Sequence, residues 1–125
     1  MLALVAVAAA AGARPAEPQP APAPPRVLHL TVRDVITSGT AEYLGSALER
    51  ARAEGYDAVA VTLDTPGGHL DATRDIVQRM LASPVPIAVW VGPAGARAGS
   101  AGVFITLAAH VAGMHPASNI GAAHP

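Results

Sequence analysis

Strand-like and helix-like segments alternate along most of this sequence, and that order constrains the fold more than any other feature. Short apolar runs rich in β-branched residues are typical of strands, and apolar residues three and four positions apart are typical of amphipathic helices. Their alternation predicts an α/β fold with a mostly parallel sheet, because parallel strands need a crossover that is usually helical. The expected strands are residues 27–32, 58–63, 86–91 and 111–114, and the expected helices are residues 38–54, 70–81 and 103–109.

The spacing of apolar residues also predicts which helix faces are buried. A serine or threonine within residues 38–40 is expected to cap the first helix, and Gly55 is expected to end it. Residues 116–125 are expected to form a loop. The expected buried positions are Tyr43, Leu44, Ala47, Leu48 and Ala51 in the first helix, and Leu70, Thr73, Ile76, Val77, Met80 and Leu81 in the second.

Residues 1–25 do not have the composition of a folded domain. Residues 1–13 resemble a secretory signal peptide, because they are apolar, too short to span a bilayer, and end in a small-residue cleavage pattern. No basic residue precedes the apolar run, so the start of this segment is either misassigned or incomplete. Residues 14–25 contain six prolines and are expected to form an extended linker. The domain is therefore predicted to cover residues 26–125 and to work outside the cytoplasm.

Composition excludes several classes of function. The formal net charge is −1, so the chain lacks the basic surface of a nucleic-acid-binding protein. The absence of cysteine excludes a disulfide framework, a thiolate zinc site and a cysteine nucleophile. All eight basic residues are arginine, so no lysine of this chain can serve as a base. We expect neither a metal site nor a cofactor.

Two glycine-rich turns follow strands and are therefore expected at the same edge of the sheet, where parallel sheets bind ligands. In the second turn, residues 92–102, Ser100 lies between glycines at the start of a helix. A serine placed after a strand and before a helix is exposed, and the helix N-terminus favours negative charge beside it. We therefore predict that Ser100 is a nucleophile.

The first turn, residues 64–68, contains two consecutive glycines. They could simply permit a tight turn, but without Cβ atoms they also let backbone N–H groups approach a substrate. An N–H of this turn and that of Ala101 would together form a two-donor oxyanion hole for acyl transfer. Phosphate binding is the rival interpretation, and it is disfavoured because the glycine spacing fits neither the dinucleotide motif nor the P-loop.

A serine nucleophile needs a base, and these residues do not identify one. His69 adjoins the first turn and His124 is in a loop that can return to the site, so both are candidates to line the cleft. A lone histidine is more often a packing residue than a catalytic one. Asp64 is expected to cap the turn or helix that follows it.

Several motifs, in order and spacing, resemble those of the NfeD family, which are membrane-bound serine proteases with a Clp-protease/crotonase-like fold, encoded beside stomatin-like proteins. The resemblance covers about residues 27–125. The motifs are Leu63-Asp64-Thr65-Pro66-Gly67-Gly68 with Leu70-Asp71, Ile76-Val77-Gln78, Ser83-Pro84-Val85-Pro86, Gly95-Ala96-Arg97-Ala98-Gly99-Ser100-Ala101-Gly102, and Asn119-Ile120-Gly121-Ala122-Ala123-His124-Pro125.

The resemblance implies that Ser100 is the nucleophile and that the N–H groups of Gly68 and Ala101 form the oxyanion hole, with Gly67 shaping the turn. It implies a lysine as general base at a position beyond Pro125, so these residues would be the N-terminal part of a longer protease and inactive alone. In Clp peptidases a histidine near the position of His124 is the base, but NfeD-type enzymes do not need it.

The resemblance also implies a substrate, which is an apolar segment of a stomatin-like (SPFH) membrane protein. The complete enzyme would be a membrane-anchored homo-oligomer at the extracytoplasmic face. Two alternatives remain open. One is a non-catalytic domain that binds or scaffolds a stomatin-like partner. The other is a crotonase-type enzyme that uses the same hole for acyl-CoA thioesters, against which the signal-like start argues.

Overall fold

A four-stranded parallel sheet organises the structure, which is a computed structural model that describes residues 3–124. The strand order is β1-β2-β3-β5, and every neighbouring pair is parallel. The predicted α/β fold with a parallel sheet is therefore confirmed. The elements of residues 3–124 are β1 (Val27–Arg33), α1 (Ser38–Ala53), β2 (Ala58–Asp64), α2 (Leu70–Leu81), β3 (Ile87–Val91), β4 (Arg97–Gly99), α3 (Ala101–Leu107), β5 (Val111–Met114) and β6 (Asn119–Gly121).

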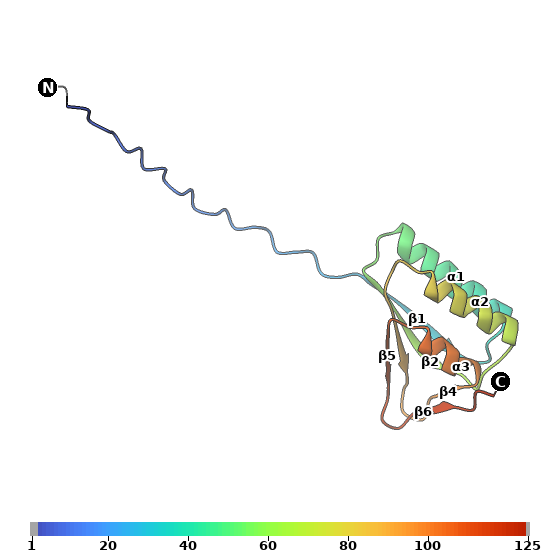
Figure 1. Cartoon of the computed structure of the whole chain (residues 1–125). Coiled ribbons are helices and arrows are strands. Elements are labelled where there is room, and N and C mark those ends of the chain that lie inside the picture. The colour runs from blue at the N-terminus through green and yellow to red at the C-terminus, as the bar shows by residue number, and fades with distance from the viewer. Residues whose placement is uncertain (1–2, 125) are drawn as a thin grey trace.

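The helices lie on the same face of this sheet (Figure 1). Right-handed crossovers that always step in the same direction, from β1 to β2, β3 and then β5, place their helices on one side. Burial follows this asymmetry. In β2, Val59, Val61 and Leu63 are buried under the helices, whereas the alternate residues are half-buried. Val61 lies opposite Leu30 of β1 and Val89 of β3, so apolar side chains form a continuous row beneath the helices.

The core fills the space between this row and the helices. Leu44 of α1, Ile76 and Met80 of α2 and Ile105 of α3 are almost completely buried there. Burying such side chains is the main source of stability in a domain of this size. The helix periodicity predicted the buried position of each α1 and α2 residue named here.

The ends of α1 follow from local chemistry. Its N-cap is Thr37, one residue before the predicted range, and Thr37 forms a reciprocal capping box with Thr40. Glu54 is the C-cap, and Gly55 follows it with a φ of 67°, a left-handed conformation that glycine adopts without strain. The prediction that Gly55 ends this helix is confirmed.

Three predicted core residues are exposed, and for these the prediction was wrong. Tyr43 is 48% exposed, Leu70 is 61% exposed and Leu81 is 69% exposed. Leu70 and Leu81 are the first and last residues of α2, where their side chains face α3 across an open groove instead of the sheet. The apolar face of each helix is thus wider than the part of it that is buried in the core.

A second, two-stranded sheet was not predicted. β4 lies inside the second glycine-rich turn and pairs in parallel with β6, within the segment predicted to be a loop. Strands of three residues are too short to show a periodic pattern, and their pairing depends on a partner far along the chain. α3 also begins at Ala101, two residues before the predicted start. Pro125, the last residue of the predicted loop, lies outside the described residues.

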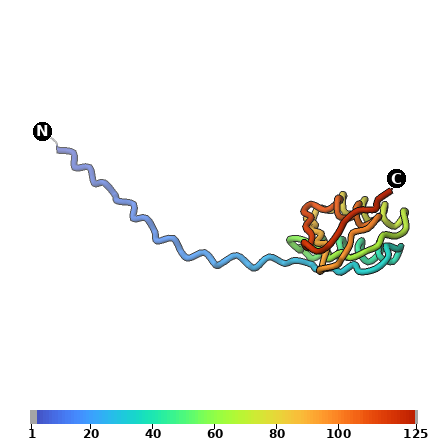
Figure 2. The backbone as a smooth tube through the Cα atoms, turned by 90° about the horizontal axis from the view of Figure 1, so that it is seen from below, coloured from blue at the N-terminus to red at the C-terminus, as the bar shows by residue number. Residues whose placement is uncertain are grey.

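Residues 3–26 contain no helix or strand and extend away from the domain (Figures 1 and 2). Met1 and Leu2 of the predicted signal segment lie outside the described residues. The division into a signal segment and a linker stays a prediction. None of the helices within residues 3–124 is both long enough and apolar enough to cross a membrane.

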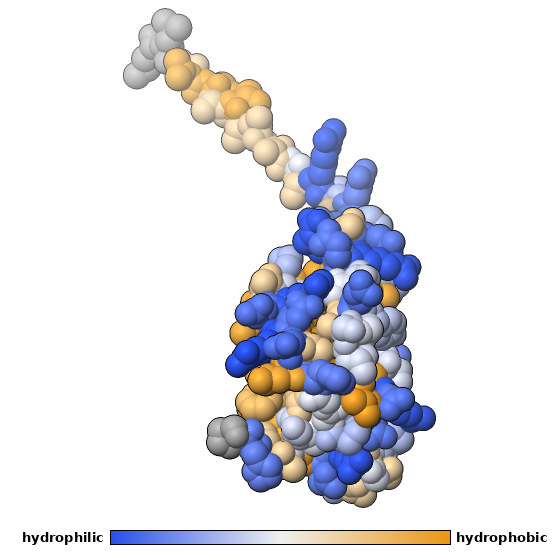
Figure 3. Space-filling view, turned by 90° about the vertical axis from the view of Figure 1, so that its right-hand side faces the viewer, coloured by the Kyte–Doolittle hydropathy of each residue, from blue (hydrophilic) through white to orange (hydrophobic). Residues whose placement is uncertain are grey.

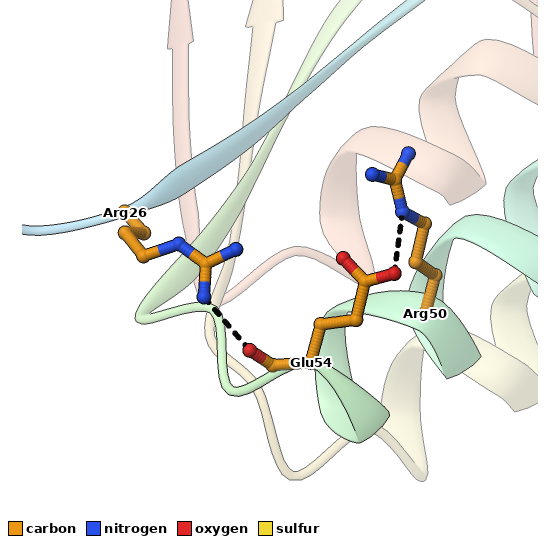
Figure 4. Close-up of polar contacts among 3 residues, drawn as sticks. All are labelled: Arg26, Arg50 and Glu54. Carbon is orange, nitrogen blue, oxygen red and sulfur yellow. Dashed lines mark hydrogen bonds and ion pairs between the residues drawn. The ribbon is translucent and has the colours of Figure 1, made fainter.

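The extended segment joins the domain at Arg26, whose contacts are partly shown in Figure 4. Its backbone N–H donates to the Asp57 carboxylate at 2.7 Å, and its guanidinium donates to the Glu54 carbonyl at 2.9 Å and lies 4.3 Å from the Tyr56 ring centre. The Glu54 carboxylate accepts a hydrogen bond from Arg50, which raises the pKa of the Arg50 guanidinium. These contacts hold the start of β1 against the loop between α1 and β2.

Ile76→Ala should lower the free energy of unfolding by about 2–5 kcal/mol, because it removes a fully buried side chain and leaves a cavity under α2. The exposed Gln78 of the same helix provides the control, and Gln78→Ala should change the free energy by less than about 0.5 kcal/mol. Urea denaturation followed by circular dichroism measures both. Equal effects of the two substitutions would contradict the packing described here.

Candidate functional site

The first turn leaves the carboxyl end of β2 and is fixed by its own backbone contacts. Gly67 has a φ of 123°, which a side chain would strain. The Ile36 N–H donates to the Gly67 carbonyl at 2.9 Å, and the His69 N–H donates to the Ile36 carbonyl at 2.9 Å. A Cβ on Gly68 would lie only 2.1 Å from the Ile36 carbonyl oxygen, so this position requires glycine.

The second turn runs through β4 to Ser100, which is the residue before α3. Ser100 has a φ of 48° and a ψ of −106°, a conformation that residues with side chains rarely adopt. Its N–H donates to the carbonyl of Gly121 in β6 at 2.8 Å. The second sheet therefore fixes the backbone of Ser100 through this hydrogen bond.

The two turns touch each other. A Cβ placed on Gly67 would lie 2.8 Å from the Ser100 Cβ and 3.4 Å from its hydroxyl oxygen. A Cβ on Gly99 would lie 2.8 Å from the Pro66 carbonyl oxygen. The structure thus brings Ser100 and the two glycines of the first turn together at the carboxyl edge of the sheet, as the shared direction of the strands predicted.

Polar groups of both turns are available to a ligand. Within residues 3–124, the N–H groups of Gly68 and Ala101 donate to no backbone carbonyl or side chain. Ala101 is the first residue of α3, where helical N–H groups lack partners and the helix dipole favours negative charge. Ser100 is half-buried, so its hydroxyl remains accessible. This arrangement places an accessible hydroxyl beside two free donors.

The predicted cleft-lining histidines lie at the borders of the site. His69 is exposed at the N-terminus of α2, beside Thr37 and Ser38. His124 is exposed three residues after Gly121, which is within about 11 Å of that residue along the chain. Within the part of the chain that the structure describes, no three acidic or histidine side chains gather closely enough to hold a metal ion.

The remaining histidines have structural partners. The His29 ring lies 2.8 Å from the Thr62 hydroxyl, and the His110 ring accepts a hydrogen bond from the Ile87 N–H. The His115 ring accepts one from the Ala117 N–H. These contacts engage the three rings in stabilising the sheet and its loops.

Asp64 does not cap its own turn or helix, so that prediction was wrong. Its carboxylate accepts a hydrogen bond from the Arg97 N–H at 3.1 Å, which fastens the end of β2 to the start of β4. The carboxylate is therefore used to join the two turns.

The sequence-based search missed Thr65, which is completely buried between the two turns. Its hydroxyl both donates to the Gly67 carbonyl and accepts from the Gly67 N–H, at 3.2 Å and 3.1 Å. Threonines commonly bond backbone groups two residues further along, so its position before Pro66-Gly67 was the available signal. Gly121 was also missed, because β6 was not predicted.

An apolar groove of about 550 Å³ lies between α2 and α3. Its lining includes Leu70, two residues after Gly68, and Phe104, one helical turn after Ser100. Figure 3 faces the helices and shows apolar side chains at the surface among polar ones. The residues lining the groove are Leu70, Thr73, Arg74, Val77, Gln78, Leu81, Phe104, Leu107 and Ala108.

Two curated proteins are similar to this chain in sequence. The membrane-bound protease PH1510 of Pyrococcus horikoshii is 39% identical over 94 residues, which are 75% of this chain and 21% of PH1510. The membrane protein NfeD1b of Bacillus subtilis is 30% identical over 94 residues, with the same two coverages. The chain thus spans about a fifth of the length of these relatives.

Solved structures show the same fold. The solved structure of a mutant of 1510-N, a membrane-bound stomatin-specific protease, in complex with a substrate peptide has a TM-score of 0.78 and 38% identity, covering 81% of this chain and 46% of the solved chain. ClpP1 from Listeria monocytogenes has a TM-score of 0.68 and 21% identity, covering 78% of this chain and 56% of ClpP1. The similarity to ClpP1 concerns the fold alone, and the Clp-protease-like fold is confirmed.

The match to a family model covers the whole domain. The N-terminal domain of NfeD1b matches residues 26–125, beginning at the residue where the extended segment joins β1. The resemblance to the NfeD family, which rested on motifs spread over about residues 27–125, is therefore confirmed by the extent of the match and by the two relatives. With its paired glycine turns on a Clp-protease-like sheet, this chain belongs to the NfeD family.

Proposed function

We propose that this chain carries the nucleophile and the oxyanion hole of a serine endopeptidase. The observation that carries the proposal is the backbone of Ser100, whose φ is 48°. Holding a residue other than glycine in such a conformation costs about 1–3 kcal/mol, and strain of this kind clusters at active sites. Ser100 lies between β4 and α3, and in this conformation its hydroxyl lies beside Gly67.

In the proposed mechanism, Ser100 Oγ attacks the carbonyl carbon of the scissile peptide bond and forms a tetrahedral intermediate. The N–H groups of Gly68 and Ala101 donate hydrogen bonds to its oxyanion. The leaving amine takes up the proton that a base removed from the hydroxyl, and the acyl-enzyme is then hydrolysed by water. The two free N–H groups beside Ser100 support this assignment.

The general base in this proposal is a lysine of a longer chain, as the family resemblance implies. The arginines cannot replace it, because a guanidinium stays protonated in proteins. His124 is the weaker candidate. No hydrogen bond among the described residues joins it to Ser100.

The proposed substrate is an apolar segment of a stomatin-like membrane protein, cleaved at the extracytoplasmic face. The groove between α2 and α3 supports this, because it is lined mainly by apolar side chains and two of them, Leu70 and Phe104, follow the two turns closely in the sequence. The similar protease 1510-N is stomatin-specific, and its structure was solved with a substrate peptide. Both curated relatives are membrane proteins, which supports a membrane location for the complete enzyme.

Ser100→Ala in the full-length protein should abolish cleavage of an apolar peptide, because the nucleophile is lost. Ser46→Ala is the matched control, since Ser46 is exposed on α1, and it should cleave like the wild type. Cleavage is followed by mass spectrometry of the products. Retained cleavage in Ser100→Ala would refute the assignment, and peptide binding without cleavage by the wild type would favour the scaffold alternative.

Ser100→Gly should be more stable than Ser100→Ala by about 1 kcal/mol, because glycine adopts a φ of 48° without a Cβ penalty. Both variants lack the hydroxyl, so the comparison isolates the backbone strain. Thermal unfolding of the two proteins measures the difference. Equal stabilities would show that the surrounding structure does not impose strain on Ser100.

Leu107→Glu should raise KM for an apolar peptide by about tenfold with little change in kcat, because it places a charge in the groove and weakens binding before and during the reaction alike. Val111→Glu is the control, since Val111 is similarly exposed on β5 but does not line the groove. Steady-state kinetics separates the two constants. An unchanged KM in Leu107→Glu would place the substrate elsewhere.

A further inference from the structure

We propose that Thr65 is a positioning residue that orients the Gly68 N–H toward the carbonyl attacked by Ser100. The inference rests on the proposed function for its catalytic meaning. Its structural basis is independent, because Thr65 is fully buried and contacts both turns.

The backbone of Thr65 joins the two sheets. Its N–H donates to the Arg97 carbonyl at 2.7 Å, and its carbonyl accepts from the Gly99 N–H at 2.9 Å. Thr65 therefore pairs with Ala98 of β4 directly after β2 has left the four-stranded sheet. The residue before Ser100, Gly99, is thus hydrogen-bonded to Thr65 in the first turn.

The hydroxyl of Thr65 fixes the peptide group between Gly67 and Gly68. The Gly67 carbonyl accepts from the Thr65 hydroxyl at 3.2 Å and from the Ile36 N–H at 2.9 Å. In a planar trans peptide the N–H points opposite to the carbonyl. Holding the Gly67 carbonyl with two donors therefore sets the direction of the Gly68 N–H, which is the proposed oxyanion donor.

The methyl group of Thr65 contacts the other turn. A Cβ on Gly102 would lie 2.8 Å from the Thr65 Cγ2, so this methyl group packs against the N-terminal end of α3. This end of α3 begins with Ala101, whose N–H is the second proposed oxyanion donor. One buried side chain thus links the two donors. Its hydroxyl bonds Gly67, which precedes Gly68, and its methyl group contacts the helix that carries Ala101.

Two substitutions separate these roles. Thr65→Val keeps the shape and the methyl contact but removes the hydroxyl, which leaves the buried Gly67 N–H without its acceptor. Thr65→Ser keeps the hydroxyl and removes the methyl. Thr106→Val is a matched control, because Thr106 is also buried and its hydroxyl donates to a backbone carbonyl at 2.7 Å, that of Gly102.

In the full-length protein, Thr65→Val should lower kcat by about tenfold to a hundredfold with KM within about twofold, since an oxyanion donor is misdirected but not deleted. Thr65→Ser should keep kcat within about threefold of the wild type, and Thr106→Val should do the same. Hydrogen exchange over residues 64–69 provides a readout apart from activity. It should speed up by about tenfold in Thr65→Val and stay unchanged in the other two variants.

Equal kcat values and equal exchange in Thr65→Val and Thr65→Ser would overturn the proposal. A loss of activity that tracks the melting temperature across all three variants would overturn it as well, because the role would then be structural only. A wild-type protein that cleaves no peptide would refute the proposed function. In that case the exchange of residues 64–69 still decides whether the hydroxyl holds this peptide group.

Discussion

The site depends on the short backbone pairing between Thr65 and β4. Through it, the end of β2 leaves the large sheet and joins the small one, so that two turns separated by the 23 residues 69–91 meet. Close approach is possible because glycines stand at the contacts. A Cβ at Gly67, Gly99 or Gly102 would come within 2.8 Å of an atom of the other turn. These glycines are therefore needed for the contact between the two turns and not only for the backbone conformation of each turn.

The one-sided sheet explains the surface beside the site. The helices lie on the same face, and α2 packs against α1 and α3, but a groove remains between α2 and the short α3. Apolar residues at both ends of α2, Leu70 and Leu81, line this groove and stay exposed. The same arrangement that supports Ser100 from the sheet edge thus leaves an apolar surface next to it, which is where an apolar ligand gains most from leaving water.

Much of the fold could be predicted from the sequence because the relevant signals are local. The bounds of α2, Leu70–Leu81, agree with the prediction, since an amphipathic repeat is complete within one helix. The placement of Ser100 near Gly67 followed from a single rule, that parallel strands end at the same edge. β6 and the contacts of Thr65 could not be predicted, because three residues or one residue carry no periodic signal.

The helices, the strands of the four-stranded parallel sheet, their order and the two turns that carry the candidate residues all follow from the amino-acid sequence. Only the tertiary structure shows that Tyr43, Leu70 and Leu81 stay exposed, that Asp64 accepts a hydrogen bond from the Arg97 N–H, and that the Gly121 carbonyl accepts one from the Ser100 N–H. The difference lies in the range of the interactions. Propensity and periodicity act between neighbouring residues, whereas burial and the pairing of short strands depend on which distant segments the folded chain brings into contact.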